Sequence, residues 1–184
     1  NWISNAKFIW GADLKLDNVI YFRKKVLKPS STTLSGNLSG NLSMTFPNLN
    51  GDKLNMDNTC DGKAISPAIS WSQIPEGTKS LALVMDTIPG PPRAGEVQVG
   101  NHYYITQFNI LPSKNGFAEG EITPYSPPCS QGPGPKIYVL TLYALNAPPT
   151  INVPNTQVTM DILLAGMKNK IVDSAVMSVT YTRP

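Results

Sequence analysis

The only histidine of the chain, His102, is the side chain that points most directly to acid–base chemistry. With Ser126 or Ser130 as nucleophile and Asp86 to orient the imidazole, His102 could act as the base of a hydrolase. No supporting motif is present, because the sequence holds no G-x-S-x-G elbow, Walker loop or dinucleotide fingerprint. We therefore rank hydrolysis last among the functions suggested and interpret His102 as a strand-end or pocket-lining residue.

Metal-binding side chains are few. One histidine and two cysteines exclude sites built on several imidazoles and the usual four-ligand zinc site. Asp57, Asp61 and Glu76 could chelate calcium, but an oxygen cage needs about six to eight ligands. Turn-forming aspartates are the simpler interpretation. We expect no metal and no other cofactor.

The two cysteines, Cys60 and Cys129, lie in loops rich in Gly, Pro, Asp or Ser. In a cytosolic protein such a pair would be unrelated thiols, whereas in an exported protein it predicts a disulfide worth about 2–4 kcal/mol. The low charged fraction of 15% and the many Asn, Ser, Thr and Pro residues fit the exported case. No signal peptide is visible, so we expect the processed form of a periplasmic or secreted protein.

The charge distribution excludes several partners. The formal net charge is +3, and residues 1–40 carry six of the 15 bases but only two of the 12 acids. The rest of the chain therefore has no basic face of the kind that nucleic acids require. Uninterrupted apolar runs are short, so we expect no transmembrane segment.

The elements that must position these side chains are mainly strands. Proline is abundant, 17 of 184 residues, which argues against a helical bundle. Runs rich in β-branched, aromatic or Leu residues predict strands at Ser43–Phe46, Ser80–Met85, Tyr103–Phe108, Lys136–Leu145 and Val176–Tyr181. One helix is predicted at Thr159–Lys168, with Thr159 as N-cap and Asp161 in the first turn. The fold class is mainly β, with antiparallel sheets, a C-terminal helix and long Pro-rich loops at 86–101 and 112–135.

Residues 1–40 read as an N-terminal extension to a domain formed by residues 41–184. The extension contains a β-rich run, Asp17–Leu27, that could form a strand or hairpin. An added strand could pair across the edge of a homodimer or cover an exposed sheet edge. A homodimer or another protein is therefore a possible partner.

Three blocks of sequence resemble the phosphatidylethanolamine-binding protein family, also called Raf-kinase-inhibitor-like, in a divergent bacterial form. The first block runs from Asn58 through Ile65–Trp71 to Ser80, and the second comprises Tyr125–Gly134 followed by Tyr138–Leu145. The third is the tail Ile162–Arg183. The resemblance covers about residues 43–183 and implies the family's fold. Within it, Ser66-Pro67 indicates an extended lead into a strand, and Pro75–Thr78 indicates a turn between two strands.

The resemblance also implies a small pocket for phosphate-like or carboxylate groups at one end of the sheet. At matching positions this chain departs from the family: Thr87, preceded by Asp86, takes an aspartate position, while Tyr104 and Lys136 replace histidines. Tyr104 offers a hydroxyl and Lys136 a fixed positive charge, so binding should depend less on pH than with two imidazoles. The predicted ligand-binding residues are Asp86, Thr87, Pro91, His102, Tyr104, Tyr125, Pro127, Pro128, Gly132, Gly134, Lys136 and Tyr138.

These features predict a non-catalytic binding protein for a small anion such as phosphate, a carboxylate or a phospholipid headgroup. The alternative is a protein-interaction or inhibitor module in which the pocket is vestigial, since fold does not fix function. A hydrolase using His102 is the third hypothesis.

Overall fold

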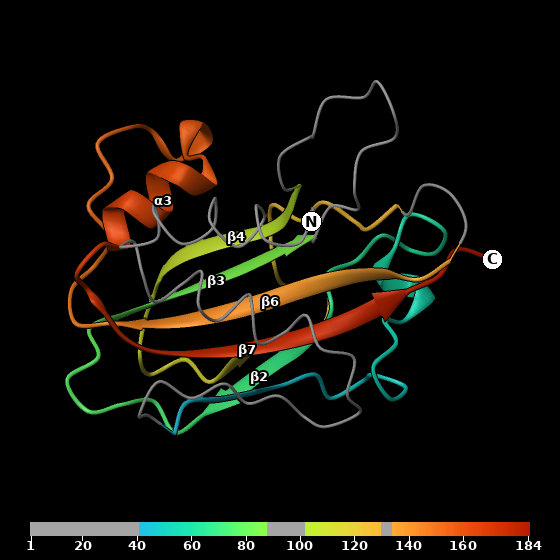
Figure 1. Cartoon of the computed structure of the whole chain (residues 1–184), viewed down its shortest axis with the longest axis horizontal. Coiled ribbons are helices and arrows are strands. Elements are labelled where there is room, and N and C mark those ends of the chain that lie inside the picture. The colour runs from blue at the N-terminus through green and yellow to red at the C-terminus, as the bar shows by residue number, and fades with distance from the viewer. Residues whose placement is uncertain (1–40, 88–101, 130–133) are drawn as a thin grey trace, which may run out of the picture.

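The computed structural model describes residues 41–87, 102–129 and 134–184 (Figure 1). The predicted extension 1–40 with its strand, and the predicted site residues Pro91 and Gly132, lie outside the described residues. Within the described residues, no helix combines the length and apolar character needed to cross a membrane.

The larger of two sheets contains four strands in the order β4-β3-β6-β7. These are β3 (Ser80–Thr87), β4 (Tyr103–Ile110), β6 (Lys136–Leu145) and β7 (Ile171–Tyr181). The smaller sheet has the order β1-β2-β5, formed by β1 (Ser43–Thr45), β2 (Ile69–Ser72) and β5 (Gly116–Phe117). Every pairing between these strands is antiparallel, so the predicted fold class is confirmed.

The core lies on both faces of the larger sheet because side chains alternate along each strand. Leu83 of β3 and Leu140 of β6 are fully buried toward the smaller sheet, where Trp71 packs against them. On the opposite face, Val84 and Tyr143 pack with buried Leu163 of helix α3 (Met160–Met167). The order of layers is therefore small sheet, large sheet and helix, with α3 at one end of the strands (Figure 1).

Helix α3 begins as predicted. The Thr159 hydroxyl oxygen accepts a hydrogen bond from the backbone N–H of Ile162 at 3.4 Å, and Asp161 lies in the first turn. Two short 3₁₀ helices, η1 (Met56–Asn58) and η2 (Asn155–Gln157), lie in the connections.

The strands differ from the sequence-based boundaries in four places. Strand β1 ends at Thr45, one residue before the predicted end at Phe46. Strand β7 begins at Ile171, five residues before the predicted start, and β3 and β4 each extend two residues further than predicted. Strand β2 follows the Ser66-Pro67 segment as expected, and the Pro75–Thr78 turn closes with a hydrogen bond from Thr78 N–H to the Pro75 carbonyl. Strand β5 was not predicted, since two residues are too few to show a strand period.

Candidate functional site

One end of the larger sheet collects the predicted site residues. The antiparallel register places Thr87 opposite Tyr138, and Lys136 opposite Tyr181, where β3 and β7 end and β6 begins. This end is opposite α3 in Figure 1. Two coil segments, residues 58–61 and 125–129, border it, and we call them the rim.

The rim is held together by a covalent bond and two hydrogen bonds. Cys60 and Cys129 form a disulfide with an S–S distance of 2.05 Å, which confirms the predicted bridge. The Cys60 N–H donates to the Pro128 carbonyl at 3.0 Å, and the Tyr125 hydroxyl donates to the carbonyl of Asn58. Two segments that are distant in the sequence therefore form one border of the site.

Aromatic side chains form a continuous row beneath this border. The His102 and Tyr104 rings meet edge to face with centroids 4.6 Å apart, and Tyr104 meets Tyr138 in the same way at 5.1 Å. His102, Tyr104 and Tyr138 are therefore in contact with one another in sequence along the row.

A β-bulge aims Tyr104 into the row. Met85 pairs with Ile105 and Asp86 with Tyr103, so Tyr104 is the extra residue on β4. The Tyr104 hydroxyl is hydrogen-bonded to the side chain of Thr87. Thr87, Tyr104 and Tyr138 consequently belong to one group, as predicted, although a bulge cannot be read from the sequence.

Ser126 joins this group from the rim. Its backbone N–H donates to the Tyr104 carbonyl at 2.9 Å, and its Oγ lies 3.3 Å from Nε2 of the exposed His102. Of the two serines considered as nucleophiles, only Ser126 lies in the described residues, and it contacts the imidazole.

The remaining predicted residues differ in placement. Asp86 is buried at 5% exposure, and strand alternation directs it to the face opposite Thr87, but it lies close enough to Tyr104 to contribute to the raised pKa of that hydroxyl. Lys136 is half-buried and lies two residues from Tyr138 along β6, so its side chain projects from the same face as the row. The other predicted residues border the site as half-buried Pro127, buried Pro128 and exposed Gly134.

The tyrosines of the site are kept in their neutral, hydrogen-donating form. Burial raises the pKa of Tyr138 to about 12 and raises the pKa of Tyr125 further. Burial also raises the pKa of Tyr104, against a smaller lowering effect of its hydrogen bond with Thr87. Near neutral pH these groups are therefore phenols. The single O–H of Tyr125 is already donated to the Asn58 carbonyl, so Tyr104 and Tyr138 are the tyrosines that can donate to an anion.

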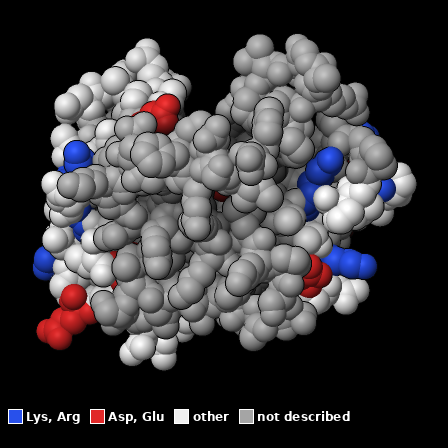
Figure 2. Space-filling view, in the orientation of Figure 1, with Lys and Arg blue, Asp and Glu red and all other residues white. Residues whose placement is uncertain are grey.

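Asp61, the acidic residue of the rim, already forms an ion pair with Arg183, which the sequence does not reveal. Asp61 accepts hydrogen bonds from the Tyr181 hydroxyl at 2.7 Å and from Arg183 Nε at 2.9 Å. Its carboxylate is thus paired, whereas Lys136 forms no ion pair with any other described residue. Figure 2 shows basic side chains at both margins of this face, and those on the right, where Figure 1 places the C-terminus, have an acidic side chain beside them.

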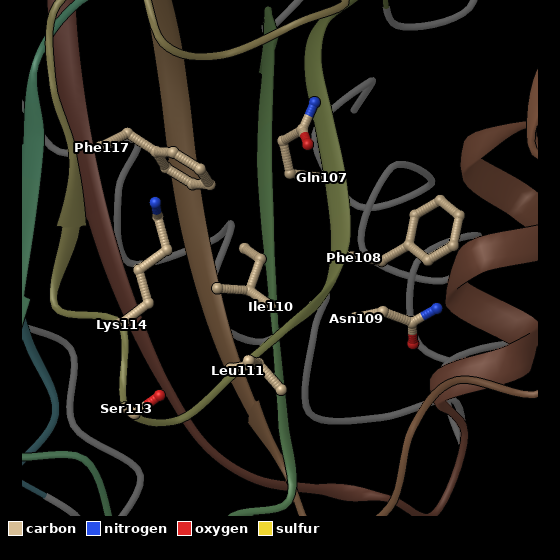
Figure 3. A pocket seen from close by; sticks show the side chains of 8 residues that line it. All are labelled: Gln107, Phe108, Asn109, Ile110, Leu111, Ser113, Lys114 and Phe117. Atoms are coloured by element: carbon tan, nitrogen blue, oxygen red, sulfur yellow. The ribbon is translucent and has the colours of Figure 1, made fainter.

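Other sites receive less support. Among the described residues, no group of three or more His, Cys, Asp or Glu side chains could hold a metal ion. A shallow hollow of about 340 Å³ lies at the other end of β4, where Lys114 sits 4.5 Å above the Phe117 ring (Figure 3). None of the predicted site residues lines it; its lining is Gln107, Phe108, Asn109, Ile110, Leu111, Ser113, Lys114 and Phe117.

Comparisons with known proteins identify the family of the chain. The family model for the phosphatidylethanolamine-binding protein matches residues 47–182. A UPF0098 protein of Aquifex aeolicus is 30% identical over 145 residues, 73% of this chain and 84% of the relative. A UPF0098 protein of Chlamydia trachomatis is 29% identical over 138 residues, which is 68% of this chain and 87% of the relative.

Two solved structures share the fold. The phosphatidylethanolamine-binding protein homologue CT736 of Chlamydia trachomatis aligns with a TM-score of 0.68 and 26% identity, over 79% of this chain and 100% of that one. YbcL of E. coli, 19% identical, aligns with a TM-score of 0.63 over 78% of this chain and 99% of its own. Together with the family model, these matches show that the chain belongs to the phosphatidylethanolamine-binding protein family.

Proposed function

We propose that this protein binds small anions, either free phosphate or carboxylate or the headgroup of a phospholipid, at the end of the sheet bordered by the rim. The observation that carries the proposal is the gathering of hydrogen-bond donors from four separate segments. Thr87, His102, Tyr104, Ser126 and Tyr138 are linked by ring contacts and hydrogen bonds, and Lys136 projects from the same face.

The charge balance of this group favours an anion over a cation. Lys136 contributes a basic side chain, and the Tyr138 phenol can donate a hydrogen bond without becoming negative. Asp61, the carboxylate of the rim, is engaged by Arg183 and Tyr181. A phosphate or carboxylate therefore meets donors here, and a charge-assisted hydrogen bond to an ammonium contributes about 1.5–3 kcal/mol.

We infer that binding occurs without catalysis. His102 is exposed, and the sequence carries no nucleophile motif of a known hydrolase class around Ser126. The Oγ–Nε2 distance of 3.3 Å between Ser126 and His102 nevertheless makes hydrolysis the second candidate. A screen on generic esters decides between them: turnover that His102→Ala abolishes, with the fold intact, would establish the hydrolase.

We infer an exported compartment, periplasmic or extracellular. The support is the disulfide between Cys60 and Cys129, because such bonds persist in oxidising environments and are rare in the cytosol. The redox state of these cysteines in protein recovered from each cell fraction tests this point.

Titration calorimetry with inorganic phosphate, acetate and phosphorylethanolamine tests the binding proposal. We expect one site per chain and a loss of affinity of about tenfold or more in Lys136→Met, because a charge-assisted bond is removed. Lys168→Met is the matched control, since Lys168 is exposed at the end of α3, away from the rim. Equal affinities in the two variants, or no heat with any of the three anions, would refute the proposal.

A further inference from the structure

The disulfide is a direct part of the border of the candidate site. Cys129 follows Tyr125 and Ser126 by only four and three residues, and its partner Cys60 lies two residues after Asn58. The same short stretch that carries Ser126 to His102 is therefore anchored through the bridge. Resting on the anion-binding function proposed above, we propose that oxidation of Cys60 and Cys129 completes the site, so that the protein binds its anion only after reaching an oxidising compartment.

Besides the bridge, this part of the rim is held by apolar packing and a few hydrogen bonds. Pro128 is buried, and half-buried Tyr125 packs against the core. The hydrogen bonds from residues 125–129 to the rest of the described chain are those of Tyr125 to Asn58, of Ser126 to Tyr104 and His102, and of Cys60 to Pro128. Hydrogen bonds of this kind each contribute only about 0.5–1.5 kcal/mol net, and the serine–histidine contact is exposed. Without the bridge, such a coil segment opens locally more easily than the strands beneath it.

The strands do not depend on the bridge in the same way. Thr87, Tyr104, Lys136 and Tyr138 are held by the ladders of β3, β4 and β6, whose inner residues are fully buried. When the bridge is lost, the hydrogen-bond donors on the strands therefore stay in place, whereas Ser126 is no longer held in position. The anion then binds only the fraction of molecules with a closed rim, and its affinity falls in proportion to that fraction.

The chemistry requires an oxidant of an ordinary class. The two thiols give up two electrons and two protons to an external disulfide by thiol–disulfide exchange: one thiolate attacks that disulfide, and the second displaces the mixed disulfide to form the Cys60–Cys129 bond. Cys129 is exposed and Cys60 is half-buried, so the Cys129 thiolate is the one that can reach an external disulfide. In a reducing cytosol the pair stays as thiols and the rim stays open.

The test compares phosphate affinity in four forms of the full chain: oxidised, reduced with dithiothreitol, Cys60→Ser/Cys129→Ser, and Leu163→Ala. Leu163 lies on the buried face of α3, and α3 is at the opposite end of the strands from the rim (Figure 1). Leu163→Ala therefore lowers the stability of the fold without changing a residue of the site. We expect the reduced protein and the double variant to bind phosphate roughly tenfold more weakly than the oxidised protein, as when one molecule in ten has a closed rim. Leu163→Ala should keep the oxidised affinity, and reductant should not change the double variant.

Hydrogen exchange of the rim gives a readout without ligand. Amides of residues 121–129 should exchange faster after reduction while those of β6 and β7 stay protected. If the double variant loses its β-sheet circular dichroism, the titration is repeated in trimethylamine N-oxide, which favours compact states. Equal phosphate affinity and equal rim exchange in the oxidised and reduced forms would overturn the inference. Oxidised protein that binds none of phosphate, acetate and phosphorylethanolamine would instead refute the anion-binding function itself.

Discussion

Removing the disulfide should cost the protein a large part of its stability. The bridge closes a loop across 69 sequence positions. In the chain-entropy model, a loop of this length stabilises the folded state by about 4.4 kcal/mol, because it restricts the unfolded chain. A domain of this size has a total stability on the order of 5–15 kcal/mol, so the effect is easily measured.

The assay is urea unfolding followed by far-ultraviolet circular dichroism, with native protein and the Cys60→Ser/Cys129→Ser variant side by side. With a slope of about 2 kcal/mol per molar urea, a loss of about 4 kcal/mol lowers the midpoint by roughly 2 M. Reductant should lower the native midpoint equally and leave the variant unchanged. A midpoint shift below about 0.5 M in both experiments would show that the bridge does not restrict the unfolded chain as reasoned here.

Three further predictions concern the site and the elements that support it. Stability should fall as pH rises from 10 to 12, by up to about 2–3 kcal/mol for Tyr138 alone, because its pKa is raised by burial to about 12 when folded and returns to its ordinary value of 10.0 when unfolded. Urea midpoints at pH 8 to 11.5 measure this, and a slope that Tyr138→Phe leaves untouched would contradict it. Gly62→Ala should destabilise the protein by about 1–3 kcal/mol, since an added Cβ would lie 2.3 Å from the Met56 backbone oxygen. Thermal unfolding measures this, and a midpoint temperature within about one degree of that of the native protein would contradict it. Thr159→Ala should cost about 1 kcal/mol through loss of the α3 cap, and Thr159→Ser should restore most of it.

The sequence predicts the long strands well because their residues repeat a clear pattern. In β6, alternate positions from Tyr138 to Ala144 face one side of the sheet and are buried, and the run Lys136–Leu145 is bounded as expected. The early start of β7 was missed because Asp173 and Ser174 interrupt its apolar pattern. Asp173 is nevertheless buried at 1% exposure, where its carboxylate accepts hydrogen bonds from the N–H groups of Leu42 and Ser174. The N–H group of Leu42 lies 131 positions from Asp173 in the sequence. The residues near Asp173 therefore do not indicate that its carboxylate is buried and hydrogen-bonded.

The sequence indicates which segments border the candidate site but does not show their geometry. The blocks around Cys60 and Cys129 indicate a shared border, and the disulfide joins them. The sequence does not show that Asp86 faces away from Thr87 while a bulge turns Tyr104 toward Tyr138, because a bulge arises from the pairing of two strands. It also does not show that Arg183 pairs with Asp61, a contact made across 122 positions.

The most direct test of the central claim is the position of a bound anion. Crystals of the oxidised protein soaked in arsenate, a phosphate analogue with an anomalous signal, would locate it without assumption. The account predicts a peak within hydrogen-bond distance of Lys136 Nζ and of the Tyr104 or Tyr138 hydroxyl. Peaks confined to surface lysines or to the hollow beside Phe117, with none near Lys136, would contradict it.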